Sequence, residues 1–148
     1  MPRARAGAYG PCCTATIAPR LPSRYFHVMR PHLDHTGFGW LEIDGQRYEH
    51  DVLIRLSGTV KKRKKKLSKR VYGTSHTISL DEAKHVFEQD ATSLILGSGQ
   101  YGNVTLSPEA ERYLSNRHCA VTLLPTPEAI AAWNDAPKSA IGLFHVTC

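Results

Sequence analysis

Histidine and cysteine side chains that could bind a metal ion occur at the end of the chain, where His145 stands three residues before Cys148. If the segment 140–148 is a regular strand, side chains three positions apart project to opposite faces, so this pair cannot hold one ion. Neither a C-x-x-C nor an H-x-x-x-H pair is present to complete a site. We therefore expect no bound metal, and we interpret His145 as a buried histidine that needs a hydrogen-bond partner.

Nucleophilic catalysis needs a serine or cysteine close to a histidine. The chain offers Ser75 next to His76, and Cys148 as a partner for either His76 or His145. Adjacency along the sequence does not establish a catalytic triad, because triad members are brought together by the fold. The sequence thus contains no complete catalytic constellation, and it predicts neither catalytic residues nor a cofactor.

A glycine-rich segment at residues 97–102 matches the pattern G-x-G-x-x-G and follows an apolar segment. Dinucleotide binding requires these glycines to lead straight into a helix, and an acidic residue at the end of the next strand. Here residues 103–106 intervene before Ser107, and no acid ends the strand near Leu124. We interpret the segment as a turn. A smaller ligand stays an alternative, because ligands favour the carboxyl ends of parallel strands.

The residues that would line such a ligand pocket come from the glycine turn, from the segment before the first predicted helix and from the last predicted strand. They are Tyr72, Ser75, His76, Gly97, Ser98, Gly99, Gln100, Tyr101, Gly102 and His145.

The net charge of +6 is unevenly distributed along the chain. Residues 1–28 hold four arginines and no acid, and the segment 61–70 holds eight cations, whereas the remainder is acidic. The basic segment lacks the interleaved aromatic residues that stack on single-stranded bases. We interpret it as a solvated loop and do not expect specific nucleic-acid binding. Any contact with a polyanion would use Lys61, Lys62, Arg63, Lys64, Lys65, Lys66, Lys69 and Arg70.

Helix starts and apolar strands alternate from Ser79 to the last residue. Helices are predicted after Ser79, Ser107 and Thr126, each an N-cap residue, with Glu82 completing a capping box. Strands are predicted at 92–96, 119–124 and 140–146, and such strand–helix–strand connections place strands in parallel. A hairpin of segments 39–44 and 46–56 turns at Asp44-Gly45 and adds antiparallel pairing. The pattern predicts a mixed central sheet with helices packed on it.

The chain length fits one domain at residues 29–148. Prolines and arginines in residues 1–28 predict a disordered tail, or a start assigned upstream of Met29. No apolar stretch is long enough to cross a bilayer, so we expect no membrane insertion. The spacing of the cysteines does not indicate a disulfide framework, which favours a reducing, cytoplasmic location.

Four segments together resemble a small domain family of unknown function. They are Gly39-Trp-Leu-Glu-Ile-Asp-Gly45, Tyr72-Gly-Thr-Ser-His76, Leu96-Gly-Ser-Gly-Gln-Tyr-Gly102 and Phe144-His-Val-Thr-Cys148. The family includes bacterial and archaeal single-domain proteins, the human adipogenesis-associated protein and the mitochondrial complex I assembly factor three. The resemblance covers about residues 38–148, and the lysine-rich segment is most similar to the prokaryotic members.

The resemblance implies a three-layer α/β fold with a mixed central sheet, and it implies no established catalytic residue or cofactor. Because animal members act as assembly or regulatory partners, it implies a non-enzymatic protein-binding or assembly module with an unidentified protein partner. The alternative is a small-ligand-binding domain, or a cryptic enzyme, with a pocket near the glycine turn.

Overall fold

A computed structural model describes residues 30–148, so the expectations for residues 1–28 lie outside the described residues. Its strands are β1 (Leu33–Gly37), β2 (Trp40–Ile43), β3 (Gln46–Tyr48), β4 (Val52–Ile54), β5 (Val60–Lys62), β6 (Thr77–Ile78), β7 (Ser93–Ser98), β8 (Thr105–Leu106), β9 (Ala120–Leu124) and β10 (Ala140–His145). Its helices are α1 (Lys66–Tyr72), α2 (Leu80–Val86), α3 (Pro108–Asn116) and α4 (Thr126–Asn134). None of these helices is long and apolar enough to cross a membrane.

The central sheet has the strand order β5-β4-β10-β7-β9. Strands β10, β7 and β9 are parallel to one another, whereas β4 is antiparallel to both of its neighbours, β10 and β5. All six residues of β10 are buried, as expected for a parallel strand that is covered on both faces. The predicted mixed sheet is therefore confirmed, and so are the three predicted parallel strands.

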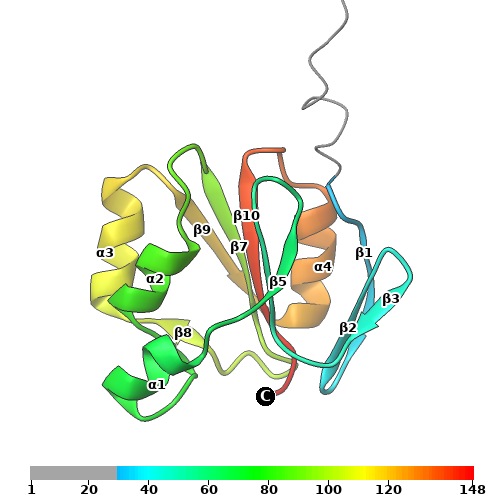
Figure 1. Ribbon diagram of the computed structural model, residues 1–148, viewed down its shortest axis with the longest axis horizontal. Coiled ribbons are helices and arrows are strands. Elements are labelled where there is room, and N and C mark those ends of the chain that lie inside the picture. Colours follow the sequence, from blue (N-terminus) through cyan, green and yellow to red (C-terminus); the bar gives the residue numbers. More distant parts are fainter. Residues whose placement is uncertain (1–29) are drawn as a thin grey trace, which may run out of the picture.

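Figure 1 shows what covers the two faces of this sheet: α1, α2 and α3 lie on one side, and α4 lies on the other together with strands β1, β2 and β3. The alternation of side chains along β7 supplies both cores. Leu94 and Leu96 pack with the residues of α2 and α3, whereas Ile95 packs with Trp133 of α4. The three-layer α/β architecture is thus the one that the sequence predicts.

The N-terminal hairpin differs from the prediction in extent. Strands β2 and β3 pair around Asp44 and Gly45, which both have positive φ. The predicted second strand is wrong beyond Tyr48, because β3 ends there and the chain enters the central sheet as β4. The reason is burial: Gln46 and Arg47 are exposed, whereas β4 is buried throughout. The described chain also forms β1 before the predicted hairpin, so the small sheet has three strands.

Of the three predicted helix caps, the one at Ser79 is only partly correct and the one at Thr126 is wrong. The hydroxyls of Ser79 and Ser107 accept backbone N–H groups, as predicted. The side chain of Glu82, however, does not return to Ser79 to complete a capping box, because it binds other buried partners. Thr126 does not cap α4, which begins after Pro125. Its hydroxyl instead donates to the carbonyl of His145, which ties α4 to β10.

Candidate functional site

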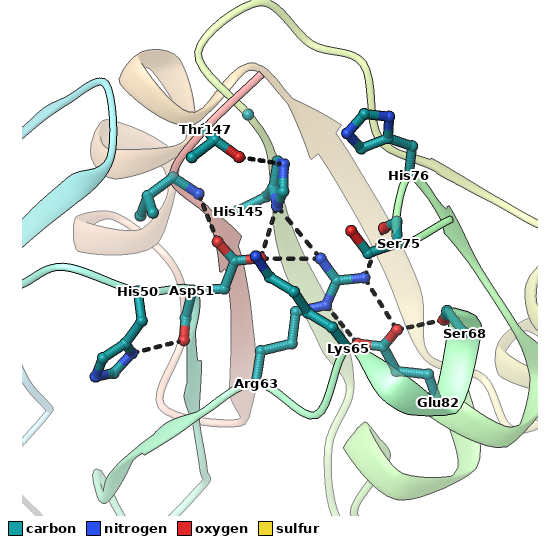
Figure 2. Close-up of polar contacts among 12 residues, drawn as sticks. His50, Asp51, Arg63, Lys65, Ser68, Ser75, His76, Glu82, His145 and Thr147 are labelled. Atoms are coloured by element: carbon teal, nitrogen blue, oxygen red, sulfur yellow. Dashed lines mark hydrogen bonds and ion pairs between the residues drawn. The ribbon is translucent and has the colours of Figure 1, made fainter. Parts of the chain in front are cut away.

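Four buried charged or titratable side chains meet at one end of the central sheet (Figure 2). Asp51 lies just before β4 and Arg63 just after β5. Glu82 lies on α2, and His145 is the last residue of β10. Four separate segments therefore contribute to one polar cluster, which we call the buried network.

Arg63 is the centre of the buried network. Its Nε donates to Oε2 of Glu82 over 2.6 Å, and its Nη1 donates to Oδ2 of Asp51 over 3.0 Å. Its Nη2 donates to Oε1 of Glu82 over 3.0 Å and to the carbonyl of Ser75 over 2.8 Å. A planar guanidinium suits this role, because its fixed fork of donors can satisfy two carboxylates at once.

The interpretation of residues 61–70 as one solvated loop is wrong. Arg63 is only 4% exposed, so it is not a contact for a polyanion. Its backbone N–H donates to the carbonyl of Asp51, which extends the β4–β5 pairing and turns the side chain inward. The last part of the segment is helical, because α1 begins at Lys66. The other cations of the segment lie at the surface, where Lys65 is half-buried and Lys61, Lys62, Lys64, Lys66, Lys69 and Arg70 are exposed.

Asp51 is held as a carboxylate. Burial raises its pKa, but the hydrogen bond and charge of His145, the N–H of Val146 and the charge of Lys65 together lower the pKa to about 2. Burial likewise lowers the pKa of Arg63, and the hydrogen bonds and charges of Glu82 and Asp51 raise it above its usual value. Asp51 and Arg63 therefore form an ionised pair within the buried network.

Glu82 connects this network to α1. The hydroxyl of Ser68 donates to Oε1 of Glu82, and the same hydroxyl accepts the N–H of Ser79. Glu82 is fully buried, so each of its carboxylate oxygens must be satisfied by a partner from the protein. The two arginine bonds and the serine bond supply those partners.

A cavity of about 720 Å³ opens beside the buried network. Five cationic and two acidic side chains line it, and one of the two acids, Asp51, is already paired with Arg63. The lining residues are Gly39, Glu49, His50, Asp51, Lys62, Arg63, Lys64, Lys65, Lys66, Val146 and Thr147. We call this the lysine-lined cavity, and its chemistry suits an anionic ligand.

The end of the chain turns back against the glycine turn. Strand β10 stops at His145, so the expectation that His145 and Cys148 project to opposite faces is wrong. The N–H of Gln100 donates to the carbonyl of Thr147, and the N–H of Asn103 donates to that of Cys148. These bonds place Sγ of Cys148 at 3.6 Å from Nε2 of His76.

His145 lies between this terminal turn and the buried network (Figure 2). Its Nδ1 is 2.6 Å from Oδ2 of Asp51, and its Nε2 is 3.0 Å from Oγ1 of Thr147. Its ring meets that of His76 edge to face, with centroids 5.6 Å apart. The sequence predicts only that buried His145 has a hydrogen-bond partner. The structure shows that this partner is Asp51.

The glycine turn contributes through its backbone. Gly99 has a φ of +101°, and a Cβ there would fall on the carbonyl group of Cys148 and lie 3.0 Å from Cδ2 of His145. Gly97 is required for a different reason, since a Cβ would approach Phe144 and Thr126 at 2.8 Å each. As expected from the sequence, the glycines do not lead straight into a helix, because β8 intervenes before α3.

The structure brings together only some of the residues predicted to line a pocket. Ser75, His76, Gly99 and His145 lie close together, and Ser98 and Gly102 flank the turn that contacts them. Three others point elsewhere. The amide of Gln100 donates to Thr36, Tyr101 is 74% exposed, and the hydroxyl of Tyr72 contacts Glu109 on α3.

Sequence reasoning missed Asp51 and Glu82. Each carried a signal, because Asp51 directly precedes the apolar run Val52–Ile54, and Glu82 stands four residues before Val86 on the apolar face of α2. A charge at such a position must be paired. The sequence alone does not say that Arg63 is the partner of both.

Comparison with known proteins identifies one family that matches this chain. A family model described as "Protein of unknown function (DUF498/DUF598)" matches residues 33–137, which is more than half of the chain. No curated protein matches the chain significantly.

Solved structures agree with this match. A conserved hypothetical protein from Pyrococcus horikoshii OT3 is 31% identical, with a TM-score of 0.71 over 78% of this chain and 98% of its own. The protein MT938 is 30% identical, with a TM-score of 0.67 over 80% and 99% of the two chains. A protein from Bordetella pertussis, described as a Mth938-like domain, shares the fold at 13% identity, with a TM-score of 0.52 over 89% and 92%. The chain therefore belongs to the DUF498/DUF598 family of proteins of unknown function.

Proposed function

We propose that this protein is a non-enzymatic binding module whose lysine-lined cavity receives a small anionic ligand that carries phosphate or carboxylate groups. The observation that supports this proposal is the excess of positive charge around the cavity. Among residues 30–148, Lys62, Lys64 and Lys66 form no ion pair. Their ammonium groups stay available to a ligand, whereas Arg63 is fully engaged below them.

The buried network supports this function by making the floor of the cavity rigid. Arg63 is held by two carboxylates, and Asp51 also accepts the backbone N–H of Val146. A ligand that binds to a preformed site loses less free energy in ordering the protein. A single strand of nucleic acid suits the cavity less well, because the lining offers only the ring of His50 for stacking.

The test replaces two lining lysines and compares them with two lysines of the same segment that lie outside the cavity. We expect Lys62→Gln with Lys64→Gln to weaken the binding of pyrophosphate and citrate at least about tenfold, roughly 1.4 kcal/mol. Lys61→Gln with Lys69→Gln removes the same charge and should leave binding within about twofold, because these lysines do not line the cavity. Titration calorimetry at fixed ionic strength measures both.

Equal losses in the two double variants would show general charge attraction and contradict the assignment of the cavity. The same conclusion follows if the unaltered protein binds neither pyrophosphate nor citrate. Unchanged melting temperatures in both variants would show that the lysine changes act on binding, as expected for exposed side chains.

A protein-binding role is the second candidate, and an exposed aromatic pair supports it. Phe38 and Tyr101 are 61% and 74% exposed, and their rings meet at a tilt with centroids 6.3 Å apart. Aromatic side chains are enriched where proteins dock. The resemblance to a family with assembly and regulatory members supports the same role.

Affinity capture from the native cell tests this second candidate. We expect Phe38→Ser with Tyr101→Ser to lose a partner that the unaltered protein retains, because exposed aromatic side chains contribute much of the binding free energy at protein interfaces. The matched control is Val71→Ser with Tyr72→Ser, which removes two exposed apolar side chains from α1. A partner retained by the first variant and lost by the control would contradict this surface as the docking site.

A further inference from the structure

The geometry points to a binding site for a single zinc ion formed by His76, His145 and Cys148. One ligand atom from each of these three residues lies within 4.8 Å of the other two. Sγ of Cys148 and Nε2 of His76 are 3.6 Å apart. Two ligands at about 2.3 and 2.0 Å from a tetrahedral zinc ion stand about 3.5 Å from each other, so this pair needs almost no movement.

Asp51 acts as an outer partner that orients one of these ligands. Its Oδ2 lies 2.6 Å from Nδ1 of His145, which directs Nε2 of the same ring away from the buried network. A carboxylate in this position fixes the tautomer of a metal-binding histidine and makes its free nitrogen a stronger ligand. Nε2 of His145 now contacts the hydroxyl of Thr147, a half-buried side chain that must give up this bond when the ion binds.

The position of Cys148 is fixed by the backbone and not by chance contact. Its carbonyl accepts the N–H of Asn103, and the preceding carbonyl of Thr147 accepts the N–H of Gln100. This close approach is possible because Gly99 lacks a Cβ. The thiol is therefore held at the histidine pair before any ion arrives, which lowers the cost of ordering the site.

The donor set selects the kind of ion. Two imidazoles and one thiolate suit zinc, whereas magnesium and calcium require oxygen ligands. His76 and Cys148 are half-buried, so an ion can reach them from solvent. Binding releases the proton of the Cys148 thiol to the buffer, since the thiolate is the ligand. Three protein ligands leave the fourth tetrahedral position to water.

None of the three zinc ligands lines the lysine-lined cavity, although Asp51 and Thr147 border both sites. The zinc site reverses the sequence-based expectation that no metal binds. That expectation depended on a regular strand to the end of the chain, and β10 stops at His145. A purely structural role for the His76–His145 ring contact would need no thiol beside it. The zinc site and the purely structural interpretation of the ring contact therefore differ in whether Cys148 has a role.

The experiment uses the full chain with Cys12→Ser and Cys13→Ser, so that these two thiols cannot bind the added metal. The metal-free protein is titrated with Co²⁺ as a spectroscopic substitute for zinc, and then with Zn²⁺ against a chelator of known affinity. We expect one Co²⁺ per chain, a thiolate-to-cobalt charge-transfer band and the visible bands of tetrahedral cobalt. Added Zn²⁺ should displace the cobalt and raise the melting temperature.

Two variants and two matched controls locate the site. Cys148→Ala should abolish the charge-transfer band, and His76→Gln should weaken zinc binding at least about a hundredfold. Cys119→Ala removes a thiol whose pKa is raised by burial in the core, and His35→Gln removes an exposed histidine. Both controls should bind zinc as the parent protein does.

Far-UV circular dichroism of each metal-free variant verifies that the fold is retained. Because His76 and Cys148 are half-buried, we expect both substitutions to leave the folded state intact. The proposal would be overturned if Cys148→Ala still bound one zinc ion tightly. It would also be overturned if the parent protein bound zinc no more tightly than this variant does.

Discussion

Replacing Arg63 with methionine is expected to lower the free energy of unfolding by about 4 kcal/mol, because it leaves two carboxylates without their shared cation. Asp51 would keep His145 and Lys65 as partners. Glu82 would keep only the hydroxyl of Ser68, although its side chain is fully buried. Urea-induced unfolding with linear extrapolation measures the difference.

The matched control is Arg70→Met, which removes an arginine from the same basic segment. Arg70 pairs with Asp81 at 3.2 Å, but the side chains are 61% and 46% exposed, so the loss should stay below about 1 kcal/mol. Adding Glu82→Gln to Arg63→Met should recover part of the stability, because the buried negative charge is then gone. Equal destabilisation by the two arginine variants would contradict a structural role for the buried network.

The parts of the fold that could be predicted from the sequence are those with a local signal. Strands β7 and β10 are short apolar runs, and α2 and α3 each follow a serine that caps the helix. These signals involve only a few neighbouring residues, so the structure that they predict does not depend on contacts with distant parts of the chain. The division of residues 46–56 between two sheets depends on which residues become buried, and that depends on contacts with distant strands.

The candidate site was harder to predict, because its parts are far apart in the sequence. Arg63 stands between lysines, and nothing in a run of cations marks one of them as buried. It turns inward because its backbone continues the pairing of β5 with β4, while Lys62 and Lys64 on either side face solvent. Because side chains along this extended segment alternate between the two faces, the same segment supplies both the buried cation and the surface charge of the lysine-lined cavity.

The terminal residues illustrate a second limit. The apolar pattern continues to Val146, so it predicts that His145 and the residues after it belong to one strand. The strand stops at His145 when the N–H of Val146 turns to Oδ1 of Asp51, a residue 95 positions away. A side chain that replaces a strand partner in this way leaves no local pattern in the sequence.

Replacing Gly99 with alanine is expected to lower the free energy of unfolding by about 4 kcal/mol, through two effects that add. The first is the φ of +101°, which a residue with a Cβ adopts only under strain. The second is steric, since the new methyl group would fall on the carbonyl group of Cys148. Because this obstacle is backbone, no side-chain rotation relieves the clash. Chemical unfolding measures the total.

Two further variants separate these effects. Gly45 also has positive φ, at +82°, but a Cβ there meets nothing within 4 Å, so Gly45→Ala should cost only about 1 to 2 kcal/mol. Deleting Cys148 from the Gly99→Ala protein should remove the steric part and leave the conformational part, so that its loss, measured relative to the chain lacking Cys148 alone, falls toward that of Gly45→Ala. If the deletion recovers no stability, glycine is required at position 99 only because of its positive φ. The steric contact with the end of the chain would then contribute nothing.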